Sequence, residues 1–242
     1  MCICCVTSRA TELRIALAAF GVLAVLFVAF PQLDLAASGL FYRGNGQWAL
    51  NREDLWLLIP YRGLPRLGQG LLVVLLALWL LSFWPRLSKL RVRRVAIGFL
   101  LASALLGPIL VVDATLKEHS GRTRPVNIEQ FGGTKQFTPA FIPADQCDKN
   151  CSFVSGHVAT ASFIMAFGWL GAPAIRRRWL IAGLACGGLF ALVRMVPGGH
   201  FLSDTIFAWF ATYFSLWATE WAFRKLGWLP ANPSFDSSTG QI

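Results

Sequence analysis

Three short clusters of charged and small polar residues stand out in an otherwise apolar chain. Each cluster lies at the edge of a long apolar run, so each is expected near the end of a helix. Together they supply three cations, two histidines, a carboxylate and a serine beside a glycine. Such side chains can bind a phosphate group and transfer it through a histidine without a metal ion. The clusters are Lys117, Arg124 and Pro125; Ser155, Gly156 and His157; and Arg194, His200 and Asp204.

The three cations, Lys117, Arg124 and Arg194, could together hold the oxygens of one phosphate group. An arginine donates two parallel hydrogen bonds to such a group, whereas a lysine acts as a point charge. Arg194 ends an apolar run, where a charge is costly unless it faces water or a partner. Snorkelling to the membrane surface would explain a single arginine there, but not His200 and Asp204 in the same stretch. We therefore interpret Arg194 as functional.

Ser155, Gly156 and His157 stand where an apolar helix is expected to begin. The backbone amides and the dipole at a helix start favour an anion, and glycine lets the backbone approach it closely. Ser155 is also explained as an N-cap, and the two roles are compatible. We expect Ser155 and Gly156 to contact the phosphate.

The histidines suggest the chemical steps. His200 and Asp204 are four residues apart, on one face of a helix, so the carboxylate can fix the imidazole tautomer and stabilise its charged form. His200 is therefore predicted to be the nucleophile that forms a phosphohistidine. His157 remains as the acid that protonates the leaving oxygen and later as the base that activates water. The third histidine, His119, is expected to have no special role.

The apolar runs predict an integral membrane protein. Hydrophobic residues make up 55% of the 242 residues and charged residues only 14%, which disfavours a soluble domain. A helix needs about 20 mostly apolar residues to cross a bilayer. Six runs approach this length, with end errors of about 2 to 4 residues: 14–30, 64–84, 95–116, 153–171, 179–196 and 201–223. We predict an all-α polytopic protein, with a six-transmembrane-helix bundle over residues 1–229 and a disordered tail over 230–242.

Basic residues orient these spans. The loop after the second run and the loop after the fourth are rich in Lys and Arg without an acid, and such short loops face the cytoplasm. Both termini are then cytoplasmic, and the three clusters share the outer face. The net charge of +10 is explained by orientation and by anionic lipid, so no nucleic-acid partner is predicted. The loop residues are Arg86, Lys89, Arg91, Arg93 and Arg94, and Arg176, Arg177 and Arg178.

The first apolar run also has features of a signal peptide, because it begins with basic residues and is followed by small ones. We expect it to be an uncleaved helix.

Residues 47–61 alternate aromatic and apolar side chains with polar ones, as a helix lying on the outer membrane surface would. An ordinary loop is the alternative for that segment.

Two of the six cysteines, Cys147 and Cys151, lie in the predicted outer loop. They are either two free thiols or a disulfide just before the second cluster, which an oxidising compartment would permit. A zinc site is disfavoured, because the spacing is one residue longer than Cys-x-x-Cys and no further ligands complete four-coordination. We predict no metal and no cofactor. The amino-terminal Cys2, Cys4 and Cys5 receive no role.

The segments KEHSGRTRP, SGH and VRMVPGGHFLSD resemble the three signature motifs of the type 2 phosphatidic acid phosphatase superfamily, Lys-x6-Arg-Pro, Pro-Ser-Gly-His and Ser-Arg-x5-His-x3-Asp. The chain departs from them at Val154, where proline is usual, and at Val193, where serine is usual. The resemblance implies a phosphate site and catalytic residues at the same positions as above: Lys117, Arg124, Ser155, Gly156 and Arg194 around phosphate, with His157, His200 and Asp204 as acid, nucleophile and partner.

Within that superfamily, the long outer loop is similar to that of bacterial lipid A phosphatases. The resemblance implies hydrolysis of the 1- or 4′-phosphate of lipid A by a multi-pass inner-membrane protein with its site facing the periplasm. The partners expected are the lipid phosphate substrate and the bilayer, and no oligomeric state is predicted. Phosphatidylglycerophosphate and undecaprenyl diphosphate are alternative substrates, because their phosphate-binding residues would look the same.

A non-enzymatic lipid or anion transporter or binding protein is the competing class. Charged residues near membrane spans also mark transport paths. A transporter, however, usually places its charges near the bilayer midplane, whereas these clusters share one surface. A binding protein descended from an enzyme would have lost a histidine or the aspartate, and none is lost.

Overall fold

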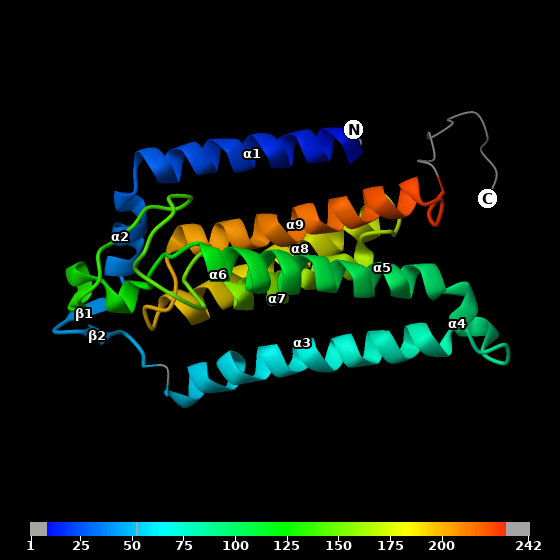
Figure 1. Ribbon diagram of the computed structural model, residues 1–242, viewed down its shortest axis with the longest axis horizontal. Coiled ribbons are helices and arrows are strands. Elements are labelled where there is room, and N and C mark those ends of the chain that lie inside the picture. Colours follow the sequence, from blue (N-terminus) through cyan, green and yellow to red (C-terminus); the bar gives the residue numbers. More distant parts are fainter. Residues whose placement is uncertain (1–8, 52, 231–242) are drawn as a thin grey trace, which may run out of the picture.

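A computed structural model describes residues 9–51 and 53–230, and helices dominate it, as predicted (Figure 1). The amino-terminal cysteines and the predicted tail from residue 231 onward lie outside the described residues. The elements are α1 (Arg9–Ala29), α2 (Gln32–Gly39), β1 (Tyr42–Gly44), β2 (Gln47–Trp48), α3 (Leu55–Leu81), α4 (Ser88–Val92), α5 (Arg94–Ala104), η1 (Leu105–Leu116), α6 (Lys117–His119), η2 (Pro125–Asn127), η3 (Glu129–Phe131), α7 (Gly156–Ser162), η4 (Phe163–Gly168), α8 (Pro173–Met195) and α9 (Leu202–Lys225).

Within the described residues, four helices are long and apolar enough to cross a membrane: α1, α3, the continuous stretch from α5 through η1 to α6, and α8. The predicted fourth span corresponds to a shorter apolar helix, Gly156–Gly168. The predicted sixth span corresponds to α9, which is 24 residues long but buries several polar side chains, including Thr212 and Glu220. Because α9 packs against α1, α5, α7, α8 and η1, its polar groups face protein rather than lipid.

The predicted surface helix over residues 47–61 is wrong. Gln47 and Trp48 form β2, which pairs antiparallel with β1. A turn follows, in which Asn51 N–H donates to Asp54 Oδ2 at 2.7 Å, and α3 begins directly after it at Leu55. The second half of the predicted surface helix is therefore the first part of a long, candidate membrane-spanning helix.

The predicted loop at 176–178 is also wrong, because these arginines lie inside α8. Pro173 stands in the first turn of that helix, a position that proline favours. Arg176 is buried and donates to Glu12 Oε1 of α1 at 2.7 Å, and Tyr213 of α9 donates to the same oxygen at 2.7 Å. A buried, paired arginine does not mark a loop, and here it joins α1, α8 and α9.

The end of the molecule that lies opposite to the start of α8 is covered by α2, the β1–β2 hairpin and the long loop between α6 and α7 (Figure 1). Trp48 and Phe131 pack there against Phe201, just before α9. Gly198 has a φ of +64°, and a Cβ on it would lie 2.4 Å from a ring atom of Trp48. The hairpin thus packs directly against the backbone that leads into the third cluster.

Candidate active site

The structure brings the three clusters together at that end of the helices. Lys117 begins α6, Ser155 is the residue before α7, and Asp204 lies in the first turn of α9. The backbone N–H of Ser155 donates to the carbonyl of Asp204 at 3.0 Å. A Cβ placed on Gly156 would lie 2.9 Å from Nζ of Lys117. Residues up to 87 positions apart in the sequence therefore line one site.

His200 is fully enclosed, and its two ring nitrogens are distinguished by a hydrogen bond. Nδ1 lies 2.8 Å from the backbone carbonyl of Ser152. Because a carbonyl only accepts, Nδ1 carries the proton and Nε2 keeps the lone pair. Burial lowers the pKa of His200 to about 3, so the ring is neutral near neutral pH. A neutral imidazole with a defined unprotonated nitrogen is what a nucleophile requires.

Asp204 lies close to His200, but it is not the nearest partner. Oδ2 of Asp204 is 3.5 Å from Nδ1 of His200, farther than the carbonyl of Ser152. The same oxygen accepts from Oγ of Ser152 at 2.5 Å and from the N–H of Phe201 at 2.8 Å. The carboxylate therefore orders the loop that holds His200, in addition to facing the ring.

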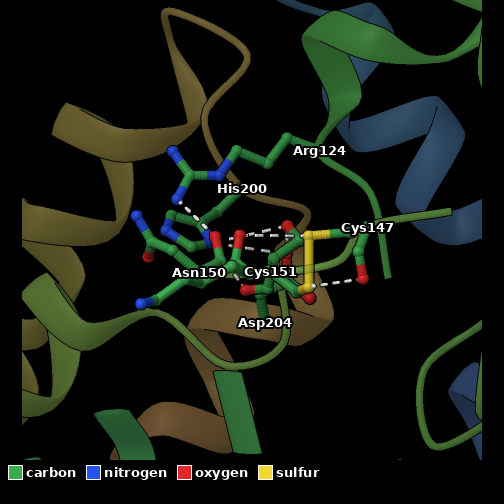
Figure 2. The surroundings of a disulfide bond; sticks show 8 residues. Arg124, Cys147, Asn150, Cys151, His200 and Asp204 are labelled. Atoms are coloured by element: carbon green, nitrogen blue, oxygen red, sulfur yellow. Dashed lines mark hydrogen bonds and ion pairs between the residues drawn. A yellow bond between two sulfur atoms is a disulfide. The ribbon is translucent and has the colours of Figure 1, made fainter. Parts of the chain in front are cut away.

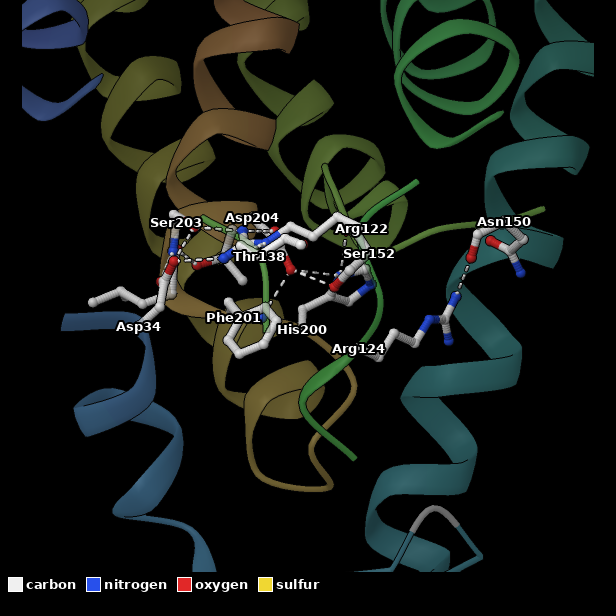
Figure 3. A network of polar contacts seen from close by, with 12 residues as sticks. Asp34, Arg122, Arg124, Thr138, Asn150, Ser152, His200, Phe201, Ser203 and Asp204 are labelled. Atoms are coloured by element: carbon white, nitrogen blue, oxygen red, sulfur yellow. Dashed lines mark hydrogen bonds and ion pairs between the residues drawn. The ribbon is translucent and has the colours of Figure 1, made fainter. Parts of the chain in front are cut away.

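Figure 3 shows a buried polar network that links Asp204 to Arg122, Asp34 and Ser203, three residues that were not predicted from the sequence. Arg122 donates to Oδ1 of Asp204 at 2.6 Å and to Oδ2 of Asp34 at 2.8 Å. Ser203 donates to Asp34 through both its N–H and its hydroxyl. Burial raises the pKa of Asp34, whereas the charge of Arg122 opposes that shift. The network anchors the carboxylate of Asp204 to α2.

Sequence signals for this network existed but were weak. Asp34 is an isolated acid in the apolar stretch PQLDLAAS, where an unpaired charge would be expensive. Arg122 lies only two residues before Arg124, and the first motif specifies an arginine at position 124 but not at 122. Ser152 and Tyr61, which also contact site residues, carried no signal in their type or spacing.

The three predicted phosphate-binding cations are all at the site. Arg194 is buried, with its guanidinium carbon 4.5 Å from the ring centroid of Tyr61. Arg124 donates to the carbonyl of Asn150 at 3.0 Å. Lys117 pairs with Asp113 at 3.1 Å, one helical turn away. Positive charge thus approaches the region of His200 from three separate elements.

Ser155 occupies the N-cap position of α7 but makes no capping hydrogen bond with its side chain. Its hydroxyl is buried, and no group in the described part of the chain bonds to it. A buried hydroxyl without a partner is unusual in a folded protein. A bound anion would satisfy it, so the geometry favours phosphate contact over the capping role.

Gly156 provides a test of the phosphate site. We expect Gly156→Ala to raise KM about ten-fold. The new methyl would displace Nζ of Lys117 and so remove its hydrogen bond to the phosphate, and a hydrogen bond to a charged group is worth about 1.5 kcal/mol. Both atoms within 3 Å of that methyl are ends of flexible side chains, so the fold should tolerate it. Steady-state kinetics would measure the effect, with Gly188→Ala as control, since a Cβ there meets nothing within 4 Å. An unchanged KM would remove Lys117 from the phosphate site.

His157 is held by α3. Its Nε2 lies 2.8 Å from the carbonyl of Tyr61, and its ring stacks on that of Tyr61 with centroids 5.0 Å apart and planes inclined by 17°. His119, in contrast, is exposed, and its Nδ1 lies 2.8 Å from the carbonyl of Thr115. Two of the three histidines are therefore at the site, and the third is outside it.

Cys147 and Cys151 form a disulfide in the structure (Figure 2). The residues next to it contact the site directly. Asn150 accepts from Arg124, as described above, and the N–H of Cys151 donates to the carbonyl of Lys117 at 2.9 Å. Ser152, the next residue, holds His200. The disulfide therefore closes a small ring in the segment that supports both the cations and the nucleophile.

Breaking this disulfide is expected to lower the free energy of unfolding by about 2 kcal/mol, because the ring spans a sequence separation of only four residues and short rings restrain the unfolded chain least. The double variant Cys147→Ser, Cys151→Ser should also raise KM, since Asn150 supports Arg124. Thermal unfolding in detergent and steady-state kinetics would measure both effects, with Cys186→Ser as control, because Cys186 lies outside the disulfide. Unchanged melting and KM would show that the bond supports neither fold nor site.

A metal centre was not predicted. Among residues 9–51 and 53–230, no group of three or more His, Cys, Asp or Glu side chains is placed to hold a metal ion. Three acidic side chains near the site are engaged by cations: Asp34 and Asp204 by Arg122, and Asp113 by Lys117. That the reaction needs no cofactor stays a prediction.

Comparison with known proteins agrees with the site. The model of the PAP2 superfamily matches residues 95–228, which include all three clusters. The chain is 36% identical over 199 residues to the lipid A 4′-phosphatase of Francisella tularensis subsp. novicida (strain U112), covering 80% of this chain and 87% of that protein. It is 30% identical over 215 residues to the lipid A 4′-phosphatase of Rhizobium etli, covering 78% and 79%.

A third relative, the lipid A 4′-phosphatase of Rhizobium leguminosarum, is 38% identical over 120 residues, or 49% of each chain. No solved structure gives a significant match. The family match covers more than half of the chain, and the first two relatives align with most of it. The chain therefore belongs to the PAP2 superfamily and is a phosphate monoester hydrolase with membrane-type helices.

Proposed function

We propose that this protein removes the 4′-phosphate of lipid A through a phosphohistidine on His200. The observation that carries the mechanism is the hydrogen bond between Nδ1 of His200 and the carbonyl of Ser152, which leaves Nε2 as a nucleophile. The substrate rests on the names of the relatives, since each is a lipid A 4′-phosphatase. This choice selects one of the two phosphate positions that the sequence had left open.

In the first step, Nε2 of His200 attacks phosphorus and forms the N–P bond. The bond from phosphorus to the sugar oxygen breaks, and His157 gives its proton to that oxygen. Lys117, Arg124 and Arg194 stabilise the charge on the three remaining phosphate oxygens. As electron density leaves the ring of His200, the nearby carboxylate of Asp204 compensates the developing positive charge.

In the second step, water attacks phosphorus from the side that the lipid has left. His157, now neutral, takes a proton from that water. The N–P bond breaks, its electron pair returns to Nε2 of His200, and inorganic phosphate leaves. The two histidines are then in their starting states, so the cycle consumes only water.

We further propose six membrane spans, with both termini in the cytoplasm and the site on the periplasmic face. To the four candidate spans this adds α9, of 24 residues, and the helix from α7 through η4. The basic residues between α3 and α5 support this orientation. A disulfide beside the site is consistent with an oxidising compartment. The ion pair between Glu12 and Arg176 supports retention of the first helix.

The alternatives predict different results in one experiment. Phosphatidylglycerophosphate and undecaprenyl diphosphate phosphatases would use the same phosphate-binding residues. A transporter or binding protein would hold lipid without cleaving it. Its charges would be expected near the bilayer midplane, whereas Lys117, Arg194 and Asp204 lie at or next to the ends of helices. The end of the molecule where they lie is covered by α2 and the hairpin (Figure 1).

The test is phosphate release by the purified protein in detergent that contains a chelator. Lipid A, phosphatidylglycerophosphate and undecaprenyl diphosphate are compared, each with wild type and His200→Ala. Release from lipid A that leaves the 1-phosphate in place, requires His200 and resists the chelator supports the proposal. Preference for another lipid would overturn the substrate, and release lost on chelation would overturn the metal-free mechanism.

A further inference from the structure

Tyr61 belongs to none of the three clusters, yet it contacts two site residues from α3. Its ring stacks on His157, and the guanidinium of Arg194 lies over the same ring. Its backbone carbonyl accepts the hydrogen bond from Nε2 of His157. A single residue therefore holds the predicted acid by two contacts and touches a predicted phosphate ligand.

In a regular helix, the carbonyl of Tyr61 would accept a backbone hydrogen bond from the same helix. In an α-helix, the N–H of residue i+4 donates to the carbonyl of residue i. Four residues after Tyr61 stands Pro65, inside α3, and proline has no N–H. The carbonyl of Tyr61 therefore receives no hydrogen bond from residue 65, and it accepts one from His157.

This hydrogen bond decides which nitrogen of His157 faces the substrate. Because the carbonyl only accepts, the proton in the bond belongs to Nε2. His157 then enters the reaction as an imidazolium, in which Nδ1 also carries a proton. Nδ1 gives that proton to the leaving oxygen and later takes one from water. Stacking on Tyr61 keeps the ring from turning away from this arrangement.

We propose that Pro65 is a positioning residue for catalysis, which acts by leaving the carbonyl of Tyr61 to orient His157. The inference rests on the proposed role of His157 as acid. It explains why a membrane-spanning helix carries a proline beside the site, where the lost helical bond would otherwise only weaken the helix. Pro65 touches no reacting atom, so its effect must come through the orientation of His157.

The test is Pro65→Ala, which restores the N–H that competes with His157 for the carbonyl of Tyr61. The matched control is Pro60→Ala, because Pro60 lies in the same helix and its restored N–H meets the carbonyl of Trp56, a residue 85% exposed. We expect kcat on the lipid phosphate to fall about 30-fold in Pro65→Ala, within the range of general acid catalysis. KM and the melting temperature should stay near wild type, and Pro60→Ala should retain its kcat.

The leaving group provides a second readout that a merely structural defect would not reproduce. p-Nitrophenyl phosphate has a good leaving group and needs little help from an acid. In Pro65→Ala, the rate of the step that releases p-nitrophenol should therefore fall less than three-fold. His157→Ala should show the same contrast between substrates, with a larger loss on lipid. Equal losses on both substrates, or wild-type activity on lipid in Pro65→Ala, would overturn the role of Pro65.

These outcomes are separable from failure of the proposed function. If wild type releases phosphate and His157→Ala is impaired while Pro65→Ala is not, the mechanism stands and this inference is wrong. If His157→Ala is itself unimpaired on lipid, the proposed role of His157 fails, and the inference about Pro65 fails with it.

Discussion

Replacement of His200 by alanine is expected to lower kcat by on the order of 10⁴-fold or more, since loss of a nucleophile leaves only the contribution of binding and charge stabilisation. The structure supports a loss in kcat rather than in KM. His200 is buried, and its Nδ1 is committed to the carbonyl of Ser152, so the ring contributes through Nε2 to bond formation. Phosphate release under single-turnover conditions would measure the chemical step directly.

The control for this variant is His119→Ala. His119 is exposed, belongs to α6 and bonds to the carbonyl of Thr115, so its removal should change kcat by less than three-fold. Both variants should melt near the wild-type temperature in detergent. A His200→Ala protein that keeps even a tenth of wild-type kcat would contradict a covalent role for His200.

The second large effect is expected at Arg122. Its side chain is 1% exposed and joins two buried carboxylates, Asp34 and Asp204. Arg122→Met keeps much of the volume but leaves both carboxylates without their cation, and breaking a buried ion pair from one side typically costs about 3–5 kcal/mol. We expect a loss of that size in the free energy of unfolding, measured by denaturation in detergent, together with a large loss of kcat because Asp204 supports the loop of His200.

Arg43→Met is the control, because Arg43 is exposed in the hairpin. Adding Asp34→Asn to Arg122→Met should recover part of the stability, since it removes one of the two uncompensated charges. If Arg122→Met is as stable as Arg43→Met, the network does not hold the site together. If stability falls but the double variant recovers nothing, Asp34 is not coupled to Arg122.

The sequence predicted which residues lie together at the site, but not most of the groups that support them. Lys117, Ser155 and His200 could be assigned because the reaction restricts both their type and their spacing, and all three lie at one site in the structure. Asp204 was assigned as the partner of His200, yet the nearest acceptor is a backbone carbonyl, that of Ser152. Backbone groups have no residue type, so no sequence pattern could have identified this one.

The helices were predictable where a helix faces lipid, because lipid demands a continuous apolar surface. Helix α1, whose apolar side chains are mostly exposed in the structure, is such a case. A helix that packs against other helices can also carry polar residues, because protein groups pair with them. Examples are Glu220, buried in α9, and Arg176, which α8 buries against Glu12. Hydropathy therefore misplaced the start of α8, and Pro60 and Pro65 obscured the continuity of α3.

Long-range pairs were the least predictable part of the fold. Asp34 and Arg122 are 88 residues apart in the chain, and nothing local at either position specifies the other. The strand β2 was missed for a related reason. Its two residues, Gln47 and Trp48, gain their role from packing of Trp48 against Phe131 and the loop at Gly198.

The central claim is that His200 becomes phosphorylated, and one measurement tests it directly. In His157→Ala, p-nitrophenyl phosphate should still phosphorylate the enzyme, because its leaving group needs little acid, while hydrolysis of the intermediate should be slow without a base. After rapid quenching under alkaline conditions, which preserve phosphohistidine, mass spectrometry should find the phosphoryl group on the peptide that contains His200. A phosphoryl group on any other residue, or release of p-nitrophenol with no phosphoenzyme before steady state, would contradict the mechanism.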